Sequence, residues 1–415
     1  MHKAVLFAAI LLVAGAAQAD GDTATFALVP YAPGGLSADG QTVVGENISS
    51  DSLWMWRADS GTVAIGGVSS INPGGGLARV SADGSRVYGA AVDANGVRNV
   101  SVYNVGTGTW TSLGGLGGYS YAGGVSPDPA TNIGRFTATG SLWGSSGDGH
   151  YLVGQSYQGG NGTNNVRATI WNTETGSLTG LGISPYNASG PNQRTRAVGI
   201  SDDGRVVGGN GGSSNPIVWT DFDGDGVYTT IKVSGNSDGV IVNGIGDVSA
   251  DGMWAVGTGF INTASGSAYR FNTGTNTLEM LGTLGALTGA RDAATGTNRD
   301  GSIIVGYEDD ISLNPFNRVA TIWIEGQGTQ SLDSYLQGFG INTDGSFRFT
   351  TALSISDDGR NILGIGYQTG DTTARGFLVN LPAAAVPEAS TCMLMAIGLG
   401  ALGLGMRRRR PTGAA

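Results

Sequence analysis

One short phrase returns seven times along the chain, and this repeat constrains the fold more than any other feature. It reads Ser-x-Asp-Gly-x-x-apolar-x-Gly, with small variations. Asp-Gly between two short apolar segments is a strong signal for a tight β-hairpin, in which both turn residues must tolerate positive φ. The repeat therefore predicts an all-β chain built from hairpin units. The seven copies begin at Ser37, Ser81, Ser146, Ser201, Ser249, Asn298 and Ser356.

Each hairpin is followed by a third apolar segment that ends on an aromatic residue, and often by a fourth segment with a Leu-Gly phrase. Four short strands per unit describe one blade of a β-propeller. Successive Asp-Gly pairs lie 44 to 65 residues apart, which suits blades with loops of uneven length better than the steady rungs of a parallel β-helix. We expect seven four-stranded blades within residues 20–381. The third-strand aromatics are Trp56, Tyr103, Trp171, Trp219, Phe271, Trp323 and Phe377.

The two ends of the array complement each other. Residues 23–30 stand where a fourth strand would be, and the array ends after a third strand at residues 374–381. Pairing of these two segments would close the ring and leave no long exposed strand edge. We therefore predict that residues 23–30 pair with residues 374–381.

The N-terminus has the pattern of a secretory signal. Residues 1–19 contain a short basic start, an apolar run and Ala17-Gln18-Ala19 before Asp20, which predicts cleavage by signal peptidase. The alternative is an uncleaved membrane anchor. The apolar run is shorter than the ~20 residues that span a bilayer, so cleavage is favoured.

The C-terminus combines a polar signature, an apolar run and a basic stop. Residues 382–391 form an Ala/Pro-containing linker, and residues 392–410 are expected to form one transmembrane helix with an arginine stop. The positive-inside rule places the arginines in the cytoplasm and the repeat domain outside. The signature and the stop comprise Val386, Pro387, Glu388, Arg407, Arg408, Arg409 and Arg410.

This tail resembles the PEP-CTERM sorting signal of Gram-negative bacteria, although Ala389 replaces the second proline of the signature. The resemblance implies an inner-membrane intermediate that an exosortase processes, and then release to the cell surface or beyond. It also implies association with exopolysaccharide and biofilm. A plain single-pass anchor is the alternative.

The repeats themselves resemble the HAF family of extracellular repeats. The best copy joins Tyr269-Arg270-Phe271, Leu281-Gly282-Thr283-Leu284-Gly285 and the motif at Asn298. That family is defined by its repeat rather than by a reaction, so the resemblance implies an extracellular protein and supplies no activity.

Composition limits the partners and the class of fold. Glycine is abundant, at 74 of 415 residues, yet 40% of the chain is hydrophobic, so the glycines mark turns in a protein with a core. The formal net charge is −10, and it becomes more negative once the signal and the arginine stop are set aside. Nucleic acid is therefore excluded as a partner.

One loop has the opening pattern of a calcium site. Asp221, Asp223 and Asp225 alternate, and Gly226 follows at the sixth position, as in loops whose carboxylates converge on calcium. Lys232 stands where the closing acid belongs. Calcium at this loop and a solvated loop without an ion both stay open, and no other cofactor is expected.

Catalytic patterns are otherwise absent from the sequence. His150 is the only histidine after the signal, so a Ser-His-Asp or His-metal arrangement has at most one possible histidine. We therefore expect a non-enzymatic surface protein with a binding or structural role, in which the tryptophans belong to the core or stack on sugars. The alternative is a secreted glycosidase or lyase on a propeller scaffold, with acids from distant blades meeting on one face.

Overall fold

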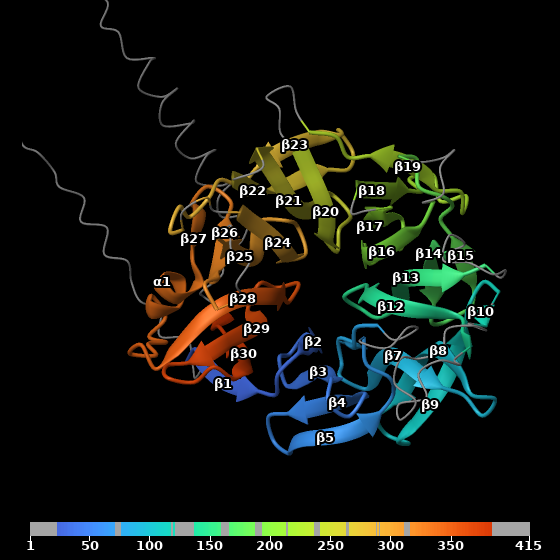
Figure 1. Cartoon of the computed structure of the whole chain (residues 1–415), viewed down its shortest axis with the longest axis horizontal. Helices are drawn as coiled ribbons and strands as arrows, with labels where there is room; N and C mark the ends of the chain where they lie inside the picture. The colour runs from blue at the N-terminus through green and yellow to red at the C-terminus, as the bar shows by residue number, and fades with distance from the viewer. Residues whose placement is uncertain are drawn as a thin grey trace, which may run out of the picture.

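The protein is an all-β propeller, in which twisted antiparallel sheets follow one another around a ring (Figure 1). Its structure is a computed structural model that describes residues 23–70, 76–117, 119–120, 137–158, 166–186, 193–212, 215–235, 241–262, 265–287, 289, 291–310 and 316–383. The signal at residues 1–19 and the tail at residues 386–410 lie outside these ranges. Within them, no helix has the length and apolar character needed to cross a bilayer.

Strands follow the chain from the inside of the ring to the outside in each four-stranded unit. The first units contain β2 (Pro33–Leu36), β3 (Thr42–Asn47), β4 (Ser52–Arg57) and β5 (Gly61–Gly66), then β6 (Arg79–Val80), β7 (Arg86–Val92), β8 (Val97–Asn104) and β9 (Thr109–Gly114). Short β10 (Tyr119–Ser120) and β11 (Thr137–Ala138) lead to β12 (Gly140–Ser145), β13 (Tyr151–Tyr157), β14 (Val166–Asn172) and β15 (Leu178–Gly180).

The second half of the ring repeats this order. It contains β16 (Thr195–Ile200), β17 (Val206–Gly211), β18 (Asn215–Thr220), β19 (Thr229–Lys232), β20 (Ile241–Val248), β21 (Trp254–Asn262), β22 (Ser265–Asn272) and β23 (Thr277–Met280). There follow β24 (Arg291–Thr297), β25 (Ile303–Asp309), β26 (Val319–Ile324), β27 (Gly328–Ser331), β28 (Phe347–Ile355), β29 (Asn361–Gln368) and β30 (Ala374–Asn380).

The number of separate sheets differs from the prediction. The described strands form six hydrogen-bonded sheets, and four of these have four strands, so the prediction of seven separate four-stranded blades is wrong. Single pairings of β24 with β21 and β22 join β20–β27 into one eight-stranded sheet, while β10 and β11 extend the sheet of β6–β9. The repeated motif locates each hairpin turn, but it carries no information on whether neighbouring sheets share hydrogen bonds.

The predicted closure of the ring is confirmed. The N-terminal strand β1 (Thr25–Val29) pairs antiparallel with β30, from Thr25 opposite Asn380 to Val29 opposite Gly376. The first described strand thus covers the edge of the last one, and Figure 1 shows β1 beside β30. This contact satisfies an edge that would otherwise be open to another chain.

The Ser-x-Asp-Gly phrases form the expected turns, with one correction. All seven glycines have positive φ, from 66° to 76°, and each donates its N–H to the carbonyl of the first residue of the motif. None of the seven aspartates, all of which are described, has positive φ. The turn needs only one left-handed residue, because a side-chain hydrogen bond holds the aspartate in place. In the first copy the hydroxyl of Ser37 donates to Asp39 at 2.5 Å. In the other copies the equivalent serine hydroxyl, or the side-chain amide of Asn298, donates to the aspartate of its own motif.

The final glycine of the repeat has a packing role. A Cβ at Gly306 would lie 1.8 Å from the carbonyl oxygen of Ala293, and one at Gly154 would lie 2.1 Å from that of Ser141. In these units the second strand therefore approaches the bulged first strand too closely for any side chain, whereas a Cβ at Gly89 would meet the Leu53 side chain of the preceding unit at 2.5 Å. This close approach explains why the phrase ends in glycine.

The third-strand aromatics form the core. Five of the seven are buried, and Trp56 and Tyr103 are partly buried and pack against the core, which supports their interpretation as packing residues. The five buried residues are Trp171, Trp219, Phe271, Trp323 and Phe377. The sequence did not predict the short helix α1 (Leu332–Gln337), which Ser331 caps and which buries Leu332 and Leu336.

Candidate functional site

The seven turns surround one end of the central channel and are linked to one another. The second residue of one motif donates its N–H to the same position of the next motif at Ala38 to Ala82 (2.9 Å), Asp202 to Ala250 (2.9 Å) and Arg299 to Asp357 (3.0 Å). These bonds fix the residues at this position around the mouth of the channel. The position is charged only at Asp202, Arg299 and Asp357.

Arg299 crosses this mouth. Its Nη2 donates to Asp202 Oδ2 at 2.7 Å and to Asp357 Oδ2 at 2.9 Å, although another turn lies between Asp202 and Arg299 in the ring. Gly147 N donates to the other oxygen of Asp202. A guanidinium and two carboxylates from three units therefore meet over the channel.

Below this ion pair lies a cavity of about 400 Å³, lined by the innermost strands of the ring. Its ionisable side chains are Arg79, Asp148, Asp247, Arg299, Asp357 and Asp358. The cavity is thus a polar space in which acids outnumber arginines, as a site for a polar or cationic ligand requires.

Arg79 and Asp247 both line the cavity and interact electrostatically. Arg79 donates to the carbonyls of Gly34, Ala78 (3.2 Å) and Trp143 (2.7 Å), so its guanidinium links neighbouring units. Burial raises the pKa of Asp247 to about 7, although amides of Val248 and Thr297 and the charge of Arg79 oppose the shift. Burial also raises the pKa of Asp357, with Asp202 adding to the effect.

Sequence reasoning did not nominate Arg79 or Asp247. Each lies on an inner strand without a local motif, and only the ring brings them together. The charged residues at the second position of three turns were visible in the sequence, and they could have indicated where the mouth of the channel is polar.

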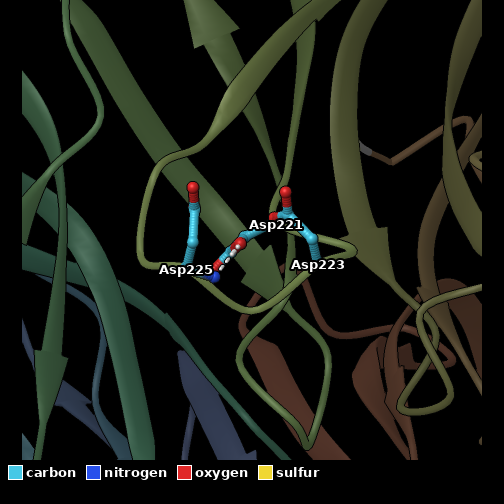
Figure 2. Close-up of side chains that lie close together, drawn as sticks. All are labelled: Asp221, Asp223 and Asp225. Carbon is cyan, nitrogen blue, oxygen red and sulfur yellow. Dashed lines mark hydrogen bonds between the residues drawn. The ribbon is translucent and has the colours of Figure 1, made fainter.

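The three aspartates of the calcium-like loop do come together (Figure 2). One carboxylate oxygen from each of Asp221, Asp223 and Asp225 lies within 4.8 Å of the others. Asp221 is buried and already accepts the amides of Gly224 (2.9 Å), Asp225 (3.1 Å) and Gly226 (3.0 Å), whereas Asp223 and Asp225 are exposed. Because Lys232 lies in β19 and no acid closes the loop, calcium binding stays a prediction.

His150 lies in its turn as expected and faces two acids. Its Nδ1 is 3.1 Å from Asp148 Oδ2 and its Nε2 is 3.3 Å from Glu174 Oε1, and about half of its side chain is exposed. No serine or cysteine completes a nucleophilic set with it among the contacts of the described residues.

Residues 385–410 match the family model described as the PEP-CTERM protein-sorting motif. The chain ends in a PEP-CTERM tail. This match includes Val386, Pro387, Glu388 and the four arginines, and a PEP-CTERM signal implies export, membrane-anchored sorting and processing by an exosortase. It does not extend into the repeats, so the resemblance of the repeats to the HAF family stays a prediction.

Similar solved structures are propellers of distant sequence. An oligogalacturonate lyase in complex with manganese is 14% identical, with a TM-score of 0.52 over 87% of this chain and 92% of that one. An oligogalacturonate lyase from Vibrio parahaemolyticus is 14% identical, with a TM-score of 0.50 over 89% and 100%. At this identity the likeness shows the fold alone. No curated protein matches the sequence of this chain.

Proposed function

We propose that this protein works outside the cell as a non-enzymatic surface or matrix protein. Signal peptidase would remove residues 1–19, the tail would hold the chain at the inner membrane, and exosortase would then process it. The PEP-CTERM motif at residues 385–410 is the single observation that carries this proposal.

The repeat domain would serve as a rigid binding or structural module within an exopolysaccharide layer. The closed strand pairing of β1 with β30 supports this role, since a ring whose two ends are joined suits an exported domain that has no second cysteine for a disulfide. The same proposal includes HAF-like repeats in the domain and a transmembrane helix at residues 392–410.

Fractionation of cells that produce the full chain or a chain ending at Ala385 tests the sorting step. We expect the full chain to pass through the inner membrane to the surface, and the truncated chain to appear in the periplasm. A matched control replaces Arg407–Arg410 with lysine, which keeps the positive charge of the stop. Unchanged location of the truncated protein would reject the proposal.

A carbohydrate-active enzyme is the second candidate, because one cavity contains several acids. Asp247 and Asp357 both line it, and Asp357 adds to the raised pKa of Asp247. A carboxyl group that is protonated near neutral pH can act as a general acid in glycoside chemistry. Polysaccharide turnover that Asp247→Asn abolishes and Asp148→Asn spares would favour the enzyme, and no turnover of a uronate or neutral polymer would count against it.

A further inference from the structure

An aromatic patch lies where the two ends of the propeller domain meet. It consists of Tyr31, Phe316, Arg348 and Tyr367, which we call the seam patch. The rings of Phe316 and Tyr367 lie 4.5 Å apart between centroids, at an interplanar angle of 36°. Tyr31 is 48% exposed and Phe316 is 36% exposed, so two aromatic side chains are open to solvent beside a buried one.

Arg348 belongs to the same patch by two independent contacts. It lies directly opposite Tyr367 in the pairing of β28 with β29. Its Nη2 also donates to the carbonyl oxygen of Phe316. An exposed guanidinium is therefore held next to the aromatic pair from a rigid strand.

Ring closure brings Tyr31 to this group. Tyr31 lies between β1 and β2, more than 300 residues before Tyr367 in the sequence. Burial raises the pKa of Tyr367, and Tyr31 raises it further, whereas Arg318 and Arg348 oppose the shift. Val29 pairs with Gly376, and Ala374, two residues from Gly376, pairs with Tyr367. Tyr31, two residues after Val29, therefore lies close to Tyr367, and the four side chains form one surface.

The charges on this surface are unequal. Arg318 is neutralised by Asp309, because its Nε lies 2.9 Å from Asp309 Oδ2. The hydrogen bond of Arg348 goes to a carbonyl group, which carries no net charge. Arg348 therefore presents a positive charge beside exposed rings in a protein whose net charge is −10.

We propose that the seam patch binds a carboxylated polysaccharide. The apolar face of a uronate sugar would lie against Tyr31 or Phe316, and its carboxylate would pair with the guanidinium of Arg348. Aromatic side chains offer an apolar surface at the edge of water, and guanidinium groups bind carboxylates through paired, charge-assisted hydrogen bonds. This inference rests on the proposed extracellular binding role and names its ligand class and residues.

Other ligands would use only part of this arrangement. A neutral glycan would contact the rings without needing the charge of Arg348, and an acidic peptide would need the charge but not the ring faces. Of the nearby acids, Asp309 pairs with Arg318 and Asp310 accepts from Asn317, and screening at physiological salt weakens repulsion by acids more than about 8 Å away. A local cation can therefore act on a polyanion despite the negative net charge.

The test uses the purified full-length protein in detergent, titrated with alginate, dextran and polyglutamate. We expect alginate to bind best, and Arg348→Gln and Phe316→Ala each to weaken alginate binding at least tenfold. Arg375→Gln removes another exposed arginine of the same sheet, and Phe222→Ala removes an exposed aromatic elsewhere. These two controls should change the dissociation constant less than twofold.

The melting temperature of each variant should stay within about 2 °C of the parent value, as expected for surface substitutions. If Phe316→Ala lowers the melting temperature further than this, Tyr31→Ala is used in its place. Absence of alginate binding, equal binding of dextran or polyglutamate, or unchanged binding by Arg348→Gln would overturn the inference. Those results would leave surface location intact, which the tail truncation tests separately. Failure of sorting would in turn leave a measured alginate affinity intact.

Discussion

Arg270 Nη2 donates to Glu325 Oε1 at 2.8 Å and so joins two neighbouring units of the ring. Its Nε also pairs with Glu279 at 2.7 Å, and the guanidinium lies over the rings of Trp254 (4.1 Å) and Trp323 (4.6 Å). The side chain of Arg270 is only 6% exposed. A planar cation is thus enclosed between two tryptophans and two carboxylates.

Arg270→Lys should lower the free energy of unfolding by roughly 1–3 kcal/mol. An ammonium group cannot stack between two rings and bond two carboxylates at once, and the partly exposed glutamates limit the loss from the ion pairs. Chemical denaturation monitored by tryptophan fluorescence measures the effect. Arg375→Lys, at an exposed position, is the matched control and should cost less than about 0.5 kcal/mol.

Asp292 should make the protein less stable as pH rises. It lies opposite Glu308 across β24 and β25, both side chains are buried, and burial followed by the charge of Glu308 raises the pKa of Asp292 to about 8. Glu308 accepts the amides of Gly285 and Leu287 at 2.7 Å each.

The decrease in stability with rising pH follows from the number of protons that the folded and unfolded states bind. An aspartate in an unfolded chain has a pKa of about 3.9, so between about pH 4 and pH 8 the folded state binds more protons than the unfolded state. The favourable contribution of Asp292 is complete below about pH 4 and is lost as pH rises through about 8, by at most ~1.4 kcal/mol per pH unit. Asp292→Asn should flatten this part of the stability profile, and an unchanged slope would contradict the prediction.

Gly306→Ala should be severely destabilising, by about 3 kcal/mol or more, because the new Cβ would overlap the carbonyl of Ala293 and force two strands apart. Gly106→Ala is the control. Gly106 has no positive φ, and its added Cβ would come no closer than 3.4 Å to Asn104 Oδ1. Thermal unfolding of the two variants should separate them by several degrees, and similar melting temperatures would argue against the close approach.

Calcium at the Asp221 loop predicts a saturable heat of binding and a rise in melting temperature with calcium concentration. Asp223→Asn should weaken both effects, since it removes a charged ligand but leaves the amide contacts of Asp221 in place. Asp59→Asn, at another exposed acid, is the control. A solvated loop predicts neither heat nor stabilisation.

Short-range sequence patterns specify the local structure of this protein. The Ser-x-Asp-Gly phrase encodes its own turn, because the hydroxyl, the carboxylate and the left-handed glycine all lie within four residues. The alternation of hairpins and aromatic strands predicted a propeller, the unfinished ends predicted closure of β1 on β30, and the charge pattern of the tail indicated sorting. The turn and tail signals lie within a few residues of the features that they specify. The propeller and its closure follow from the number of strands in each unit and at the two ends of the array.

Contacts between residues of different units follow only from the tertiary structure. Sharing of hydrogen bonds between neighbouring sheets, the placing of Arg79 and Asp247 in one cavity, the reach of Arg299 across the channel and the assembly of the seam patch all depend on distances between units. The physical reason is that a repeat specifies each unit by short-range contacts, whereas the channel and the seam arise from closing the ring, which places residues hundreds of positions apart in contact without any local sequence signal.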